Sequence, residues 1–166
     1  MSVEPGAYRQ AMGRFATGVT VVTTFSSAGT APRDHAMTAN SLTSVSLDPV
    51  LLLLSAQNDG RWLEAARECG VWGVSVLGAS ARAHAQWLAT PGRPEHGQLD
   101  RVPHHRGAAT GVALIDGAIA ELECRTRDIH LAGDHSLIVA DVLSVHTPSR
   151  AEAALVHYRG RWDHLE

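Results

Sequence analysis

The clearest periodic signal in the chain is an alternation of apolar and mostly charged side chains between Ala118 and Arg127. One set of alternate residues is apolar, and the other carries the charges: Ala118, Ala120, Leu122 and Cys124 against Ile119, Glu121, Glu123 and Arg125. A period of two residues is that of a β-strand with one face buried and the other in water. Residues 132–134, Ala-Gly-Asp, then supply a turn, and residues 136–145 return as a second long strand. The chain must therefore accommodate a wide antiparallel hairpin.

Short apolar segments separated by turns account for most of the remaining chain. Helices are predicted over 5–15, 61–68 and 80–88, and strands over 19–24, 36–38, 50–54, 71–77 and 155–162. In the helix over 61–68, Trp62, Leu63 and Ala66 are expected to face the interior. Residues 90–111 hold three prolines and four glycines and predict a long loop. Because strands dominate without regular strand–helix alternation, we expect a β-barrel or sandwich with added short helices.

Length and composition narrow the class of protein further. A chain of 166 residues fits a single domain over 1–166. Its formal net charge of −3 offers no basic footprint for nucleic acid. The longest apolar run, residues 50–54, is far shorter than the ~20 residues of a membrane span. Because the N-terminal segment also lacks the pattern of a signal peptide, we expect a cytoplasmic protein with neither a nucleic-acid nor a membrane partner.

The sequence lacks the common signatures of metal, nucleotide and nucleophilic chemistry. Cys124 falls within a predicted strand and Cys69 directly follows a predicted helix, and both are expected in the core. Because two cysteines cannot form a four-ligand zinc site and the ten histidines are scattered, we expect no metal site. No phosphate-binding G-x-x-x-x-G-K-[ST] loop, no G-x-G-x-x-G after a strand, no G-x-S-x-G and no H-E-x-x-H is present. Any catalysis therefore has to come from another arrangement.

A stretch rich in hydroxyl and amide side chains directly follows the strand predicted over 36–38. Six of the fourteen residues from 36 to 49 carry a small hydroxyl or amide group. Such a segment presents donors to a planar polar ligand. A turn that bonds to itself is the alternative, and composition alone favours that alternative.

Four stretches in a fixed order resemble the short-chain flavin reductase family. They are G-R-F-A-T-G-V-T-V-V-T at 13–23, T-A-N-S-L-T-S-V-S-L-D-P at 38–49, G-D-H at 133–135 and Y-R-G-R-W at 158–162. The resemblance implies an FMN-binding split β-barrel, a Greek-key-like antiparallel barrel with short helices, that forms a homodimer. It also implies that FMN or FAD is reduced by hydride from NADH or NADPH, and that the reduced flavin passes to a partner flavin-dependent monooxygenase.

The resemblance also assigns flavin-binding residues. The edge of the isoalloxazine ring is expected against Thr38, Ala39, Asn40 and Ser41, and the ribityl chain along Ser55, Ala56, Gln57 and Asn58. The flavin phosphate is expected at the start of the 61–68 helix, where free amides favour an anion, with Arg61 beside it. Asp59 is expected to cap that helix. An exposed Arg61 paired with Glu64 is the alternative.

The family's nicotinamide side is assigned to two further motifs. His135 is expected to meet the nicotinamide and is the candidate catalytic residue, and a plain loop histidine is the alternative. Tyr158, Arg159, Gly160 and Arg161 are expected to complete the site, with the arginines offsetting phosphate charge. A flavin-binding or electron-relay module without reductase activity, and an oxidase on the same barrel, are the alternative functions.

Overall fold

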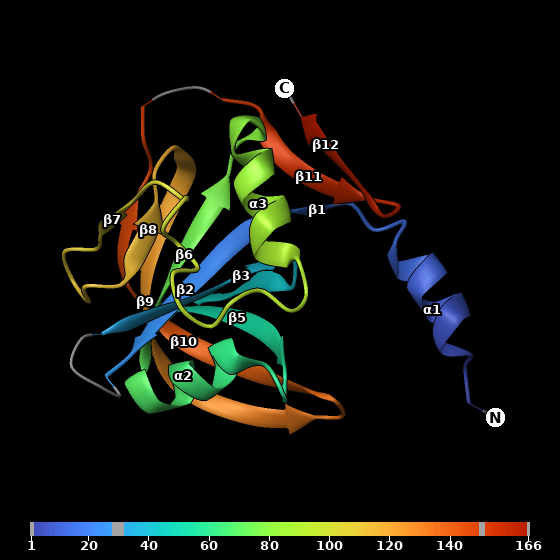
Figure 1. Ribbon diagram of the computed structural model, residues 1–166. Coiled ribbons are helices and arrows are strands. Elements are labelled where there is room, and N and C mark those ends of the chain that lie inside the picture. The colour runs from blue at the N-terminus through green and yellow to red at the C-terminus, as the bar shows by residue number, and fades with distance from the viewer. Residues whose placement is uncertain (1, 28–31, 150–151, 166) are drawn as a thin grey trace.

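The computed structural model describes residues 2–27, 32–149 and 152–165, which form mainly β structure with three short α-helices (Figure 1). The helices are α1 (Pro5–Met12), α2 (Arg61–Cys69) and α3 (Arg82–Ala89), and a 3₁₀ turn, η1, spans Ala79–Ala81. The strands are β1 (Thr17–Gly18), β2 (Thr20–Ser26), β3 (Arg33–Ala39), β4 (Leu42–Leu47), β5 (Val50–Gln57), β6 (Val71–Leu77), β7 (His104–Arg106), β8 (Ala113–Ile115), β9 (Ala118–Ala132), β10 (His135–His146), β11 (Ala154–Tyr158) and β12 (Arg161–Leu165). The predicted β-rich class with short helices is confirmed.

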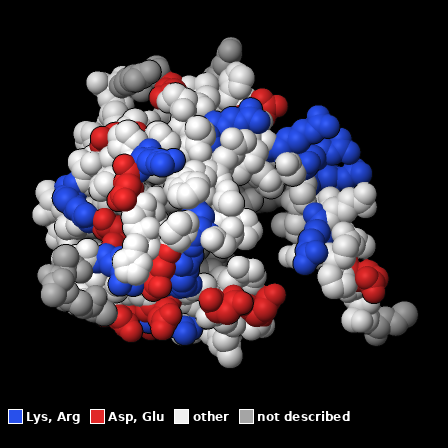
Figure 2. All heavy atoms as spheres, viewed as in Figure 1, with Lys and Arg blue, Asp and Glu red and all other residues white. Residues whose placement is uncertain are grey.

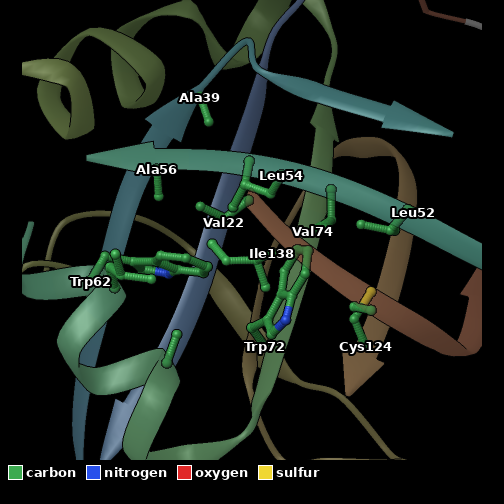
Figure 3. Packing of buried hydrophobic residues seen from close by; sticks show 13 residues of the cluster. Val22, Ala39, Leu52, Leu54, Ala56, Trp62, Trp72, Val74, Cys124 and Ile138 are labelled. Carbon is green, nitrogen blue, oxygen red and sulfur yellow. The ribbon is translucent and has the colours of Figure 1, made fainter. Parts of the chain in front are cut away.

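The main sheet has seven strands in the order β3-β2-β6-β9-β10-β5-β4. Its two edge strands, β3 and β4, are consecutive in the chain and are joined only by Asn40 and Ser41. The sheet must therefore curl until its edges meet at this bend, and Figure 3 shows the chain turning into β4 just beyond Ala39. The edges do not pair with each other, so the closed barrel that we expected is not observed. The physical reason is that β4 takes its backbone partners from β5, and β3 from β2.

The predicted wide hairpin is confirmed as β9 and β10, joined at Gly133 and Asp134. The expectation that one face of this hairpin lies in water was wrong near the start of β9. Glu121 and Glu123 are only 6% and 3% exposed. The loop before β8 covers this face, and the backbone amides of Ala109 and Thr110 donate to the Glu123 carboxylate at 2.7–3.1 Å. Backbone donors thus replace water around a charge that the alternation alone places outside.

The core next to the candidate site is built around two tryptophans (Figure 3). The rings of Trp62 on α2 and Trp72 on β6 meet edge to face, with centroids 5.7 Å apart. Helix α2 packs on β2, and Trp62, Leu63 and Ala66 are buried as predicted. Aromatic pairs of this geometry add ~0.5–1.5 kcal/mol to their burial. The start of α2 is therefore held firmly against the sheet.

Three local predictions need correction. Residues 42–47, for which a self-bonded turn was the alternative interpretation, form edge strand β4, because their backbone pairs with β5. The five apolar residues of the strand expected over 50–54 indicate a fully buried strand, but β5 alternates between buried and partly exposed residues, because it lies between β10 and β4 with one face toward the core. The single strand expected over 155–162 is two strands, because Arg159 and Gly160 adopt positive φ and turn the chain back.

Helix α1 stands apart from the body of the molecule (Figure 1). It has no buried residue, and its apolar face is open, with Tyr8, Met12 and the following Phe15 exposed. Among the described residues, no helix is both long and apolar enough to cross a membrane.

Candidate functional site

The bend between β3 and β4 lies between two other predicted site segments. The hydroxyl of Ser41 donates to the carbonyl of Ser55 at 2.6 Å, and the Ser55 amide donates back to the Ser41 carbonyl at 3.3 Å. On the other side, Asn40 Nδ2 lies 3.5 Å from His157 Nδ1 on β11. The bend therefore adjoins both the end of β5 and the strand that leads to Tyr158.

A cleft of about 420 Å³ opens beside this bend, between the end of β3, the start of α2 and the segment after α3. Three predicted site residues line it: Thr38, Gln57 and Arg61. The Thr38 hydroxyl donates to the Ala85 carbonyl of α3 at 2.7 Å, so it is already used within the wall. The cleft also contains residues that the sequence did not indicate, among them His35, Arg93 and Gln98.

The start of α2 differs from the prediction. Its N-cap is Gly60, not Asp59, and no side chain of the described residues caps the helix. The Gly60 carbonyl accepts from the amides of Leu63 and Glu64, while Asp59 is exposed. Helix termini without a cap leave first-turn amides available to an anion. The Asp59 carboxylate therefore does not occupy the amides at which the flavin phosphate is expected.

Arg61 reaches across the cleft instead of pairing along its own helix. Its Nη2 donates to the backbone carbonyl of Arg93 at 2.9 Å. No ion pair joins it to Glu64 in the parts of the chain that the structure describes, so the alternative interpretation of an exposed pair is not observed. The guanidinium remains on the cleft wall.

Arg93 is the most firmly anchored of the cleft residues that the sequence did not indicate. Its Nη1 donates to the Thr90 carbonyl at 2.8 Å and its Nη2 to the Ala36 carbonyl at 2.9 Å, while its buried Nε has no partner among the described atoms. Burial and then the charge of Arg61 lower the pKa of Arg93. Its position depends on a hydrogen bond to a residue 57 positions away in sequence. The Gly-Arg pair at 92–93, within the predicted loop, was the only local indication of a ligand-binding role.

Asn58 and the turn before β10 form one hydrogen-bonded unit. Asn58 Nδ2 donates to the Gly133 carbonyl at 3.0 Å, and its Oδ1 accepts from the buried Ser136 hydroxyl at 2.7 Å. The Asn58 amide also donates to the Asp134 carbonyl at 3.0 Å. Both polar atoms of this side chain are therefore engaged, and Asn58 positions the turn.

His135 begins β10 directly opposite Gln57 of β5, which lines the cleft. Its Nδ1 lies 2.7 Å from an Asp134 carboxylate oxygen. The hydrogen bond from His135, followed by the charge of His135, lowers the pKa of Asp134. An ionised Asp134 can only accept, so Nδ1 carries the hydrogen and Nε2 is left to face a ligand.

The turn holding Tyr158, Arg159, Gly160 and Arg161 is not brought next to His135 within one chain. Figure 1 shows the β11–β12 turn and the β9–β10 turn well apart. The Arg159 amide donates to the Gly13 carbonyl at 2.8 Å, which joins the first and last sequence motifs. Figure 2 shows basic side chains gathered where α1 meets this turn, and Arg9, Arg14, Arg159 and Arg161 are all exposed. This region is suited to an anionic ligand.

Comparison with known proteins decides the family. Residues 12–166 match the profile of the Flavin reductase like domain. The chain belongs to this family. The recognition from four short motifs is thereby confirmed, since the match runs through all of them.

Members of the family with described activities are similar over almost the whole chain. The NADH-dependent FMN reductase AsuE2 of Streptomyces nodosus subsp. asukaensis is 38% identical over 98% of this chain and 87% of its own length. The structure of BorF, the flavin reductase component of a bacterial two-component tryptophan halogenase, has a TM-score of 0.87 at 42% identity and covers 98% of both chains. The NADH:FAD oxidoreductase SgcE6 of Streptomyces globisporus, solved with NAD and FAD fragments, has a TM-score of 0.85 at 34% identity over 98% of this chain and 95% of its own.

Proposed function

We propose that this protein is an NADH-dependent flavin reductase that reduces FMN or FAD by hydride transfer and supplies the reduced flavin to a separate monooxygenase. The observation that carries the proposal is the cleft that joins Thr38, Gln57 and Arg61, three residues that the family resemblance assigned to the isoalloxazine edge, the ribityl chain and the phosphate of the flavin. The described activities of AsuE2 and SgcE6 support the same chemistry and favour NADH as the donor.

The residues of the cleft fit a flavin phosphate and its neighbouring polar groups. Two guanidiniums and an uncapped helix start face the same space. Buried polar atoms of three lining residues, His35 Nδ1, Trp62 Nε1 and Arg93 Nε, lack partners among the described atoms. Buried polar groups are normally satisfied, so a wall with three such atoms is suited to a polar ligand.

A bound flavin supplies the hydride-accepting ring, and the protein supplies position and electrostatics. The bend from Thr38 to Ser41 presents its backbone and the exposed Asn40 side chain to the ring edge. The Ala39 side chain is buried in the core, and the hydroxyls of Thr38 and Ser41 already donate to protein carbonyls. Ser55, Ala56 and Gln57 run along the ribityl chain, with Asn58 holding the turn behind them. Hydrogen-bond donors fixed before the reaction stabilise charge as it develops on a ring.

His135 orients the nicotinamide half through Nε2, because Asp134 holds its Nδ1. Tyr158, Arg159, Gly160 and Arg161 bind the remainder of the dinucleotide from a second subunit, since one chain holds that turn away from His135. Arginines at this turn offset the pyrophosphate charge.

We further propose a single domain over 1–166 with the split-barrel form of the family, in which the two sheet edges meet at the bend, and a homodimer. The open apolar face of α1, with Phe15 67% exposed, supports a second copy as its partner. Sedimentation velocity is expected to give a dimer, and removal of residues 1–16 is expected to give a monomer. A monomeric full chain would contradict this part. Because we propose free NADH as the hydride donor, we also propose that the protein acts in the cytoplasm.

The direct test follows NADH or NADPH oxidation with FMN or FAD as acceptor, at the nicotinamide absorbance band. Turnover with NADH is expected, together with reduced flavin under anaerobic conditions. A lack of turnover in all four pairings would overturn the proposal, and stoichiometric flavin retention without turnover would point to the electron-relay alternative. His135→Asn is expected to raise the KM for NADH, with flavin affinity retained.

A further inference from the structure

A second cavity, of about 560 Å³, lies between α3 and the segment that follows this helix. Helix α3 contributes His84 and Trp87 to its lining, and the following segment contributes Pro94, Asp100 and Arg101. None of its lining residues also lines the cleft at the start of α2, and none is among the residues assigned to the flavin or the dinucleotide. Its volume falls within the range of ~300–1,000 Å³ that is typical of small-molecule sites.

The walls of the second cavity are fixed by the core beneath them. Figure 1 shows the segment after α3 folding back beside the helix, where the indole nitrogen of Trp87 donates to the Gln98 carbonyl at 3.0 Å. Leu99 and Val102 are 4% and 2% exposed and belong to the same buried cluster as Ala85 of α3. Because the only polar atom of Trp87 is used within the wall, this side chain offers the cavity the surface of its ring.

Two opposite charges stand next to each other on the wall of the second cavity. Asp100 and Arg101 are consecutive and exposed, both line the cavity, and neither side chain makes an ion pair within the residues that the structure describes. The Asp100 carboxylate lies over Gly97, where the Cβ of any other residue would overlap it. The glycine therefore leaves the carboxylate its place at the cavity.

His84 adds a hydrogen-bond donor to this pair of charges. Its Nδ1 is buried and has no hydrogen-bond partner among the described atoms. A hydrogen on Nδ1 would be a buried donor without an acceptor, so the neutral imidazole carries its hydrogen on Nε2. The second cavity thus combines donors from His84 and Arg101, an acceptor from Asp100 and the aromatic surface of Trp87.

We infer that the second cavity binds an aromatic α-amino acid in its zwitterionic form. Its ammonium group pairs with Asp100, its carboxylate with Arg101 and its ring packs on Trp87. Neighbouring residues carry the two protein charges, and one carbon atom carries both charges of the ligand. An aromatic carboxylate without the ammonium group leaves Asp100 unpaired and is repelled by it, and an aromatic amine is repelled by Arg101. This binding is independent of the proposed function, because no assigned flavin or dinucleotide residue lines the cavity.

Isothermal titration calorimetry with the full-length protein tests the inference, with L-phenylalanine, phenylacetate and phenethylamine as probes. L-Phenylalanine is expected to bind with a Kd of about 0.1–1 mM, as suits a ligand of this size. Each of the other two probes lacks one charge and is expected to bind at least about 5-fold more weakly.

Charge-removing variants assign the binding to the second cavity. Asp100→Asn and Arg101→Gln are each expected to weaken L-phenylalanine binding by at least about 5-fold. Asp128→Asn and Arg125→Gln remove the same charges from exposed positions of β9, and are expected to keep the wild-type Kd within about 2-fold.

Three results would overturn the inference. The first is a lack of binding heat with L-phenylalanine at concentrations about 10-fold above the expected Kd, or an equal affinity for phenylacetate. The second is an unchanged Kd in both Asp100→Asn and Arg101→Gln, which would place the binding elsewhere. The third is displacement of L-phenylalanine by FAD and not by FMN, which would assign the cavity to the adenosine half of FAD. A lack of NADH oxidation would overturn the reductase proposal alone, and the titrations would still decide this inference.

Discussion

Substitution of Asn58 by alanine tests how the turn that carries His135 is held. Asn58 gives one hydrogen bond to the Gly133 carbonyl and receives one from the buried Ser136 hydroxyl. Each neutral bond contributes about 1 kcal/mol, and the Ser136 hydroxyl loses its acceptor, so we expect a loss of about 2 kcal/mol in the free energy of unfolding. For a domain of this size that corresponds to a Tm lower by roughly 4–8 °C.

The assay is urea unfolding followed by tryptophan fluorescence, with Asn40→Ala as the matched control. Asn40 is exposed, and its side chain makes one hydrogen bond, of 3.5 Å to His157, within the described residues, so its removal is expected to cost less than about 0.5 kcal/mol. In Asn58→Ala we also expect KM for NADH to rise while the Kd for FMN changes less than about 2-fold, because the turn moves and the cleft does not. Equal stability of the two variants, or a loss confined to FMN affinity, would refute the reasoning.

Other predictions concern Glu123 and the two thiols. Burial raises the pKa of Glu123. Hydrogen bonds from the Thr110 hydroxyl and from the Ala109 and Thr110 amides together lower the pKa by more than burial raises it, so the pKa is depressed overall. The ionised Glu123 therefore stabilises the fold at pH values above its pKa in the unfolded chain, and this stabilisation is lost as the pH falls through its pKa in the folded protein. Glu123→Gln is expected to lower the free energy of unfolding, measured with urea, by about 2 kcal/mol at neutral pH and by progressively less below about pH 4. A constant difference between the two proteins from pH 7 to pH 3 would contradict this. Burial raises the pKa of Cys124 to about 12, so a thiol reagent is expected to label Cys69 and not Cys124 in the folded protein, as read by peptide mass spectrometry.

Local sequence patterns predicted the elements that interactions between residues close in sequence define. The two-residue period of 118–127 and the Gly-Asp turn indicated the β9–β10 hairpin, and the spacing of Trp62, Leu63 and Ala66 indicated the buried face of α2. The family was found because its motifs lie at turns, where glycine and small polar residues are demanded by backbone geometry. Gly160 and Gly133, both at positive φ, are such positions.

Long-range contacts explain the structural features that could not be predicted from the sequence. Arg93 is a cleft residue because it bonds to β3 across 57 residues, and Glu123 is buried because a loop folds over it. The alternation of β9 contains no information about a covering loop. The curl of the sheet is likewise a property of strand order, since β3 and β4 are neighbours in sequence but opposite edges in space.

The central claim is that the bend from Thr38 to Ser41 and the His135 imidazole serve one flavin. A crystal structure with FMN and NADH bound tests it most directly. We predict the isoalloxazine ring against the bend, the phosphate between Arg61 and Arg93, and the nicotinamide within reach of His135. A flavin bound elsewhere, such as in the separate pocket beside His84 and Trp87, with the bend empty, would contradict the account.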